Sequence, residues 1–310
     1  MLQQDVLLFR TDATIFAMQR ALTRPSIKYI GMKMKLLHLA NTLLAGLTLV
    51  AACAAQAQTK EVTVQSADLD QLFAAGNVKG TFVLFDPQQN KWLYHDEKRA
   101  NTQYLPASTF KIPNSLIALE TKVASGPNFE LDWDSVKNPR QSWWPDSWAK
   151  KNTLHTALQN SVVWYYQEIA RRIGQKRMQS YVDQFSYGNR NISGGIDQFW
   201  LTGGLRISAK EQVDFLQRFY GDKLGASEAS TRTVKKMIVL EETPNYRLSG
   251  KSGWAGLGEK GAPQTGWLVG YLERGKNVYF YAINIDIKKS EDAAKRMTIT
   301  KEVFKKMALL

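Results

Sequence analysis

The hydrophobic pattern near both ends of the chain is typical of β-strands. β-Branched and aromatic residues fill 81–86 and 91–94, on either side of the turn-like sequence Pro87-Gln88-Gln89-Asn90, and this arrangement predicts a hairpin. Three further runs of similar composition lie in the last quarter, with a turn at Arg274-Gly275-Lys276 between the last two. These predicted strands are 246–249, 266–273 and 277–287.

Apolar residues in the middle of the chain recur every three to four positions, as they do on the buried face of a helix. One helix begins near Ser108 and tolerates Pro113 in its first turn, where no N–H is needed for an intrahelical bond. Another begins at Ser208, which forms a capping box with Glu211. The predicted helices are 108–119, 153–174, 176–185, 208–219 and 293–307, and the predicted loops are 125–150 and 188–195.

Strands at both ends with helices between them indicate the α+β class. We expect an antiparallel sheet formed by both chain ends and packed with helices, together with a mainly helical lobe. The chain has 310 residues, of which 44% are hydrophobic, and this is the composition of an ordinary globular protein.

The N-terminal segment is predicted to lie outside the folded domain. Lys33 and Lys35 precede the apolar run 36–52, and the small residues Ala55-Gln56-Ala57 follow it, which is the order of a secretory signal. The run is shorter than the roughly 20 residues of a membrane-spanning helix. We therefore interpret residues 1–57 as a signal segment and residues 58–310 as a single domain that is exported to the periplasm.

Two features of this segment have alternative interpretations. Cys53 follows Val50-Ala51-Ala52, which also suits processing with a lipid on the cysteine. A mature protein tethered to the membrane by this lipid is therefore the alternative. The residues before Met32 add nothing that a signal needs, and translation could begin at Met32 or Met34.

The net charge of +13 suggests a nucleic-acid partner, but the distribution of the basic residues does not. They are dispersed in pairs such as Lys150-Lys151 and Lys235-Lys236, without a nucleic-acid-binding motif. A dispersed positive field attracts an anionic small substrate, or is simply a solvated surface. After residue 57 the sequence has no cysteine and two histidines, His95 and His155, so we expect no metal site.

Ser108 and Lys111 are the first candidates for chemistry. At positions i and i+3 of a helix their side chains lie on one face. The helix N-terminus directs N–H groups toward negative charge beside the serine. A nucleophile, a base and part of an oxyanion site would therefore fall in one turn. An N-cap serine beside a solvated lysine has the same spacing, so this pair alone does not distinguish a catalytic site from an ordinary helix start.

Two further groups favour a catalytic interpretation. Ser161-Val162-Val163 supplies a second serine, and Lys251-Ser252-Gly253 supplies a basic residue, a hydroxyl and a glycine where a strand is starting. A serine acyltransferase with lysine as its base needs such groups. Taken singly, Ser161 could bond to backbone and Lys251 could be a solvated strand residue.

Five motifs with these residues carry a resemblance to a known family. They are Pro106-Ala107-Ser108-Thr109-Phe110-Lys111-Ile112-Pro113, Ser161-Val162-Val163, Tyr187-Gly188-Asn189, Phe199-Trp200-Leu201 and Lys251-Ser252-Gly253. In their order and spacing the chain resembles the class D serine β-lactamases, the oxacillinases, from about Thr81 to the C-terminus. The resemblance implies one catalytic domain with the fold of penicillin-binding transpeptidases. Lys-Ser-Gly in place of the Lys-Thr-Gly of many relatives keeps the hydroxyl.

The resemblance implies that Ser108 opens the ring of penicillin- and oxacillin-type β-lactams. It also implies that Lys111 becomes the general base by taking a carboxyl group reversibly from carbon dioxide or bicarbonate, the sole cofactor expected. This reaction needs an uncharged amine. A free lysine with a pKa near 10.4 rarely offers one at neutral pH, whereas a dry pocket favours the uncharged form. The residues that match such a pocket are Phe110, Val163, Trp200 and Leu201. Trp200 also offers an indole N–H, although without the family all four would be ordinary core residues.

Further roles follow from the same resemblance. Ser161 relays a proton to the ring nitrogen, and Arg296 binds the substrate carboxylate through the planar fork of its guanidinium. The backbone N–H groups of Ser108 and Trp254 form the oxyanion hole. The tryptophans at 143, 144 and 148 could line the rim of the site or pack on the core. The residues that match substrate-positioning groups are Lys251, Ser252, Gly253, Trp254, Val163 and Leu201.

Two other classes of protein share the serine and the lysine. Penicillin-sensing receptor domains stay acylated and signal, but such receptors carry membrane helices and a protease domain for which 310 residues leave no room. Cell-wall peptidases inhibited by penicillin carry extra domains and a permanent anchor, which a lipid on Cys53 would partly replace. The sequence leaves open whether the protein is a homodimer.

Overall fold

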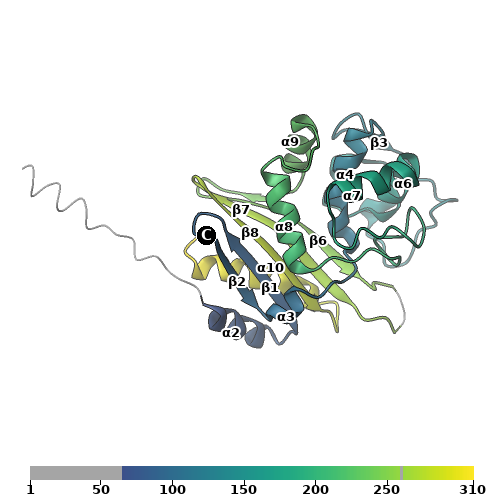
Figure 1. Ribbon diagram of the computed structural model, residues 1–310. Coiled ribbons are helices and arrows are strands. Elements are labelled where there is room, and N and C mark those ends of the chain that lie inside the picture. Colours follow the sequence, from purple (N-terminus) through teal and green to yellow (C-terminus); the bar gives the residue numbers. More distant parts are fainter. Residues whose placement is uncertain (1–64, 259–260) are drawn as a thin grey trace, which may run out of the picture. The chain divides into compact units, whose positions relative to one another are not determined.

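The computed structural model describes residues 65–258 and 261–310 (Figure 1). Their main sheet has six antiparallel strands in the order β2-β1-β8-β7-β6-β5. The N-terminal hairpin therefore pairs with the C-terminal strands, and the predicted α+β fold is confirmed. The strands are β1 (Gly80–Asp86), β2 (Lys91–His95), β5 (Val239–Glu242), β6 (Arg247–Ala255), β7 (Thr265–Arg274) and β8 (Asn277–Asp286).

The alternation of side chains along the central strands gives the sheet two apolar faces. β1 pairs with β8 through Phe82 opposite Ile283 and Val83 opposite Ala282. Phe82 and Ile283 belong to one hydrophobic cluster, and Val83 and Ala282 belong to another. Because successive residues of a strand point to opposite faces, helices must cover the sheet on both sides.

Helices from different parts of the chain cover these faces. α2 (Ser66–Gly76) and α10 (Asp292–Lys306) pack against each other and share the cluster that contains Phe82. α8 (Ala209–Tyr220) packs on β1, β7 and β8 and belongs to the cluster of Val83. The predicted capping box between Ser208 and Glu211 is present at the start of α8. A single turn, α3 (Glu97–Ala100), follows the hairpin.

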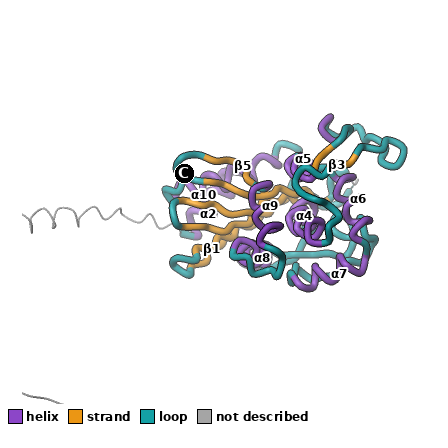
Figure 2. Tube along the Cα trace, turned by 90° about the horizontal axis from the view of Figure 1, so that it is seen from above, coloured by secondary structure: helices purple, strands orange, loops and turns teal. Residues whose placement is uncertain are grey.

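A mainly helical lobe comes from the middle of the chain and lies at one side of the sheet (Figure 2). Its centre is α4 (Lys111–Glu120), which is buried continuously from Lys111 to Leu119 and has Pro113 in its first turn. A helix that is buried on all sides needs neighbours all round. The elements packed around α4 are α5 (Leu154–Gln159), α6 (Val163–Ile173), α7 (Gln175–Gln184) and α9 (Glu228–Met237). The lobe also holds the short pair β3 (Glu130–Leu131) and β4 (Asn152–Thr153).

The prediction of one helix over 153–174 is wrong. The chain turns at 160–162, where Ser161 has a left-handed backbone with φ of 60°, so α5 and α6 are separate helices. The N–H of Val162 donates to Ala157 O at 2.9 Å and closes this turn. Leu158 and Val162 are both buried, so the apolar spacing continues across the break and conceals it.

Other elements differ from the prediction because their buried faces are small or polar. Helices α2, α3 and α9 and strand β5 were not predicted. α9 buries two polar residues, Ser230 and Thr231, as well as Val234 and Met237, and β5 is an edge strand with no fully buried residue. The predicted strand 246–249 ends too early, since β6 continues to Ala255.

The expected signal segment, 1–57, and Cys53 within it lie outside the described residues. The domain boundary before Gln58 therefore stays a prediction. In the part of the chain that the structure describes, no helix combines the length and the apolar character required to cross a bilayer.

The pairing of β6 with β7 leaves no room for a side chain at Gly270. A Cβ there would collide with the carbonyl oxygen of Ser249 on the neighbouring strand. We expect Gly270→Ala to reduce the free energy of unfolding by about 3 kcal/mol. Gly126→Ala is the control, because its Cβ would have no atom within 4 Å, and its effect should stay below about 0.5 kcal/mol. Denaturant unfolding measures both, and an unchanged midpoint for Gly270→Ala would contradict this packing.

Candidate active site

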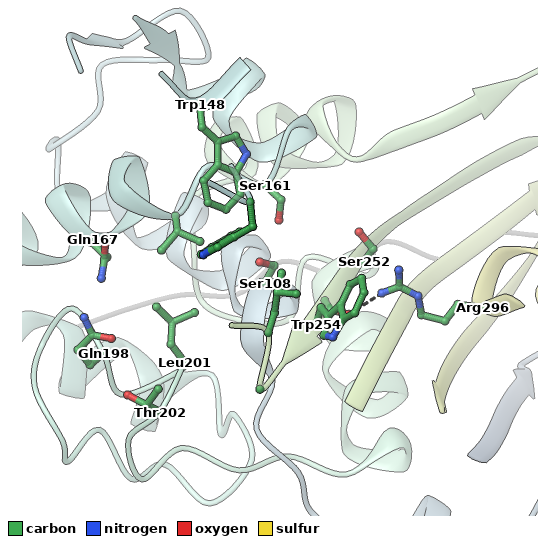
Figure 3. Close-up of a pocket in the computed structure, with 15 residues that line it drawn as sticks. Ser108, Trp148, Ser161, Gln167, Gln198, Leu201, Thr202, Ser252, Trp254 and Arg296 are labelled. Carbon is green, nitrogen blue, oxygen red and sulfur yellow. Dashed lines mark hydrogen bonds between the residues drawn. The ribbon is translucent and has the colours of Figure 1, made fainter. Parts of the chain in front are cut away.

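A cleft of about 380 Å³ brings together residues from the sheet, the helical lobe and α10. Figure 3 shows Ser108 near its centre, with Ser252 and Arg296 on one side and Gln167 and Gln198 on the other. Most of the residues predicted from the sequence line this cleft: Ser108, Ser161, Val163, Leu201, Ser252, Gly253, Trp254 and Arg296. Three other predicted residues, Lys111, Trp200 and Lys251, are buried next to members of this set, and Phe110 is buried against Trp200.

Ser108 lies in a 3-10 turn, η1 (Ala107–Phe110), that leads directly into α4. Ala107 has a left-handed backbone with φ of 48°, and its N–H donates to Trp200 O at 3.0 Å. Strand β6 passes close to this turn, because a Cβ on Gly253 would lie 3.0 Å from Pro106 O. Glycine at 253 therefore allows the sheet to approach the segment that holds Ser108.

Lys111 is the most unusual residue of the site because its side chain is 0% exposed. Its Nζ donates a hydrogen bond to Ser108 Oγ at 2.8 Å, and the ring centre of Tyr166 lies 5.3 Å from Nζ. Burial lowers the pKa of Lys111 well below its usual value, and the nearby charge of Lys251 lowers it further. An amine in this environment favours its uncharged form, in which it can accept the proton of Ser108 Oγ.

Aromatic rings form a dry wall beside this pair. Phe110 stacks on Trp200 at a centroid distance of 5.6 Å and meets Phe199 and Tyr187 edge-on at 5.0 and 5.5 Å. Trp200 Nε1 is buried and has no hydrogen-bond partner within the described residues. Because an unpaired buried N–H costs free energy, this atom marks a place that suits an acceptor group.

Ser161 enters the cleft from the break between α5 and α6. Its positive φ of 60° is uncommon for a residue with a side chain and is associated with functional sites. Figure 3 shows the hydroxyl groups of Ser108, Ser161 and Ser252 around the cleft. The break thus brings Ser161 to the position that the motif order implied, although the predicted continuous helix would have excluded it.

Lys251 is a second buried amine, in the middle of β6 and 4% exposed. Its Nζ donates to Ser252 O at 3.0 Å. Burial lowers the pKa of Lys251 to about 7, and the charge of Arg296 contributes. The interpretation of Lys251 as a solvated strand lysine is therefore wrong.

Arg296 reaches the cleft from α10 and is held by backbone carbonyls. Its Nη1 donates to Gly253 O at 2.6 Å and to Trp267 O at 3.2 Å, and its Nε donates to Ala293 O at 2.6 Å. Burial lowers the pKa of Arg296 to about 10, so it stays charged at neutral pH. A guanidinium fixed in this way can receive a carboxylate.

Several cleft residues were not predicted from the sequence. Gln167, Gln198 and Thr202 lie at the end away from Arg296 (Figure 3). Gln167 follows Val163 by one turn of α6, so the i, i+4 spacing could have identified it. The other two lie in irregular chain, where no period helps.

The tryptophans of the 125–150 loop divide between the two roles considered. Trp143 lines the cleft, Trp144 packs against the main core, and Trp148 is a buried member of that core that also lines the cleft. No three acidic, histidine or cysteine side chains among the described residues form a group that could hold a metal ion.

Comparisons with known proteins agree with this geometry. Residues 80–308 match the model of the penicillin binding protein transpeptidase domain. β-Lactamase OXA-5 of Pseudomonas aeruginosa is 43% identical over 231 residues, which cover 74% of this chain and 85% of the relative. For β-lactamase OXA-10 of the same organism, identity is 39% over 261 residues, with 84% and 96% covered. The crystal structure of the class D β-lactamase YbXI from Nostoc has a TM-score of 0.74 at 42% identity, with 78% and 99% covered.

All the candidate site residues, from Ser108 to Arg296, fall within the matched segment 80–308. The fold, the order of the motifs and the relatives point to one family of enzymes. The chain belongs to the class D serine β-lactamases, hydrolases built on the penicillin-binding transpeptidase fold.

Proposed function

We propose that this enzyme hydrolyses penicillins, including those of the oxacillin type, through an acyl-enzyme on Ser108 and thereby confers resistance to them. The observation that carries the proposal is the 2.8 Å hydrogen bond between Lys111 Nζ and Ser108 Oγ next to a cleft that also contains Arg296. A penicillin has a reactive carbonyl and a carboxylate, which these two parts of the cleft can receive. The relatives named as β-lactamases support this substrate class.

In the acylation step, Ser108 Oγ attacks the ring carbonyl carbon while the general base on Lys111 accepts the serine proton. The carbonyl oxygen gathers negative charge and is stabilised by the backbone N–H groups of Ser108 and Trp254. The carbon–nitrogen bond then breaks, and Ser161 relays this proton from the base on Lys111 to the ring nitrogen. Water later attacks the ester carbonyl carbon while the same base on Lys111 accepts a proton from the water. The bond between this carbon and Ser108 Oγ then breaks, the proton returns to Ser108 Oγ, and the ring-opened acid leaves.

The substrate carboxylate is placed by the residues at the other side of the cleft. Arg296 keeps a permanent charge near the end of β6, where Ser252 adds a hydroxyl donor. Lys251 contributes a further positive charge when it is protonated. Its pKa of about 7 means that this contribution depends on pH near neutrality.

The residues around Lys111 suit N-carboxylation by carbon dioxide or bicarbonate, the cofactor of this proposal. The buried amine favours the uncharged form that the reaction requires. Trp200 Nε1 is a buried donor that lacks a partner in the described structure, and Val163 and Leu201 line the adjoining cleft. A carboxyl group on Lys111 Nζ would supply an anionic general base, which Trp200 Nε1 would hold by a hydrogen bond.

We also propose that the enzyme acts in the periplasm after removal of residues 1–57. The order of basic, apolar and small residues before Gln58 supports export. A lipid on Cys53 would tether the enzyme instead, and the mass of the protein in a periplasmic extract distinguishes the two forms. A homodimer is compatible with either form.

Replacing Lys111 by alanine tests the assignment of the base. We expect Lys111→Ala to lower the turnover of oxacillin and of a chromogenic cephalosporin by about 10²–10⁴-fold in the chain that begins at Gln58. Lys137→Ala, whose side chain is 75% exposed, should keep the wild-type rate. If the wild type instead shows a single stoichiometric burst and a stable acyl-enzyme on Ser108, the protein is a penicillin sensor or a penicillin-binding peptidase.

Removing the indole N–H of Trp200 tests the carboxylation of Lys111. Trp200→Phe keeps a ring for Phe110 to stack on but loses a hydrogen bond to an anion, so about 10–100-fold more bicarbonate should be needed for half-maximal activity. The control is Trp267→Phe, because Trp267 Nε1 already donates to Leu105 O at 2.9 Å. Hydrolysis rates across a bicarbonate series measure both variants, and an identical response in Trp200→Phe and wild type would refute the role.

The pKa of Lys251 predicts a pH dependence of substrate binding. Below pH 7 the amine is mostly protonated and attracts the anionic substrate, whereas above pH 7 it loses its proton and this attraction. The KM for benzylpenicillin should therefore rise severalfold between pH 6 and pH 8.5. In Lys251→Arg the charge persists over this range and the rise should be absent. A KM profile that is the same in both proteins would show that Lys251 does not titrate there.

A further inference from the structure

A second cavity, of about 530 Å³, lies at the other end of β6 from the catalytic motif. Arg247, the first residue of β6, lines this cavity, whereas Ser252, Gly253 and Trp254 near the end of the strand line the catalytic cleft. The described residues that line the two cavities do not overlap. The second cavity is therefore separate from the β-lactam site.

One wall of this cavity is a basic face of α9. Arg232, Lys235 and Lys236 all line it, and their spacing of i, i+3 and i+4 places them on one side of the helix. Lys235 is held in place, since its Nζ donates to Tyr220 O at 2.6 Å and to Asp222 Oδ1 at 3.0 Å. Arg232 and Lys236 are exposed and line the same cavity.

Arg232 forms only a weak ion pair. Its Nη2 lies 3.4 Å from Glu228 Oε1, and the two side chains are 61% and 75% exposed. Exposed pairs of this kind contribute little free energy because water and salt screen them. A ligand with a higher negative charge can displace this contact.

The two carboxylates of the cavity, Glu242 and Glu273, share one arginine. Arg247 pairs with Glu242 at 2.5 Å and lies 3.7 Å from Glu273. Tyr220 OH also donates to Glu273 Oε1 at 3.0 Å. Four basic side chains and two carboxylates line the cavity, so its lining keeps a net positive charge and favours an anion.

The floor of the cavity is aromatic and apolar. Tyr220 and Tyr271 meet edge to face with ring centres 4.9 Å apart, and Val239 adds an aliphatic surface. A volume of about 530 Å³ lies in the range of small-molecule sites. It exceeds what one inorganic anion fills, so a ligand that matches this cavity has an organic part as well as an anionic group.

We propose that this cavity binds an organic phosphate, with the phosphate group between Arg232 and Lys236 and the organic part against Tyr220 and Val239. Arginine and lysine donors form charge-assisted hydrogen bonds with phosphate oxygens. The phosphate can belong to a soluble metabolite or to a lipid headgroup. The proposal does not depend on the reaction at Ser108.

Calorimetric titration with adenosine 5′-monophosphate at constant ionic strength tests this site. Adenosine lacks the phosphate and inorganic phosphate lacks the organic part, so each should bind at least about tenfold more weakly. The double variant Arg232→Gln/Lys236→Gln should weaken binding of the nucleotide by about tenfold or more. Sedimentation with vesicles of phosphatidylglycerol, against phosphatidylcholine, tests the lipid source in the same proteins.

The matched control is Lys137→Gln/Arg140→Gln, which removes the same charge from exposed side chains of the 125–150 loop. It should bind like the wild type. Both double variants should hydrolyse a chromogenic cephalosporin within about twofold of the wild-type rate, which shows that they are folded. Loss of nucleotide or vesicle binding in the Arg232→Gln/Lys236→Gln variant supports the site. Binding that this variant retains, or no binding of either probe, overturns it.

Discussion

The burial of one lysine amine is the constraint on which this active site depends. Lys111 lies at the start of α4, a helix that is buried from Lys111 to Leu119, and its Nζ has Ser108 Oγ at 2.8 Å. A charged amine is costly in such a place, and the lowered pKa of Lys111 removes most of that cost by favouring the neutral form. The same change leaves an uncharged amine beside Ser108, the form that can accept a proton or take up a carboxyl group. Stability of the lobe and reactivity of the serine thus have one physical cause.

The sheet supplies the opposite side of the site and its permanent charge. Gly253 brings β6 against the turn of Ser108, and the carbonyls of Gly253 and Trp267 orient the guanidinium of Arg296. The charge of Lys251 depends on pH near neutrality, unlike that of Arg296, because the pKa of Lys251 is about 7. The cleft therefore combines a neutral amine beside the nucleophile with a fixed cation for an anionic substrate.

Periodicity and turn chemistry predicted the parts of the fold that bury apolar side chains regularly. The β1–β2 hairpin, the β7–β8 pair and α8 with its Ser208 cap are present as expected. The break at Ser161 was missed because it depends on a single positive φ within a continuous apolar pattern. α9 and β5 were missed because one buries partly polar residues and the other is an exposed edge.

Sequence motifs predicted most residues of the candidate site. They could not predict the features of the site that arise from tertiary contacts. The motif residues line or adjoin one cleft. The indole N–H of Trp200 has no hydrogen-bond partner among the described residues, and this depends on how three aromatic rings pack. Gln198 and Thr202 join the cleft through irregular chain. The basic face of α9 is visible in the sequence as Arg232, Lys235 and Lys236, but its cavity forms only where residues of α8, β5, β6 and β7 face it.

The most direct test of this account is the ionisation of the Lys111 amine itself. Carbon-13 NMR of protein labelled at lysine Cε, titrated without carbon dioxide, resolves each amine, and Lys111→Met identifies the signal of interest. The burial of Lys111 predicts a pKa far below the ordinary lysine value of about 10.4. A Lys111 signal that titrates near 10.4 in the folded protein would contradict it, because the amine beside Ser108 would then be charged at neutral pH and could not take up a carboxyl group.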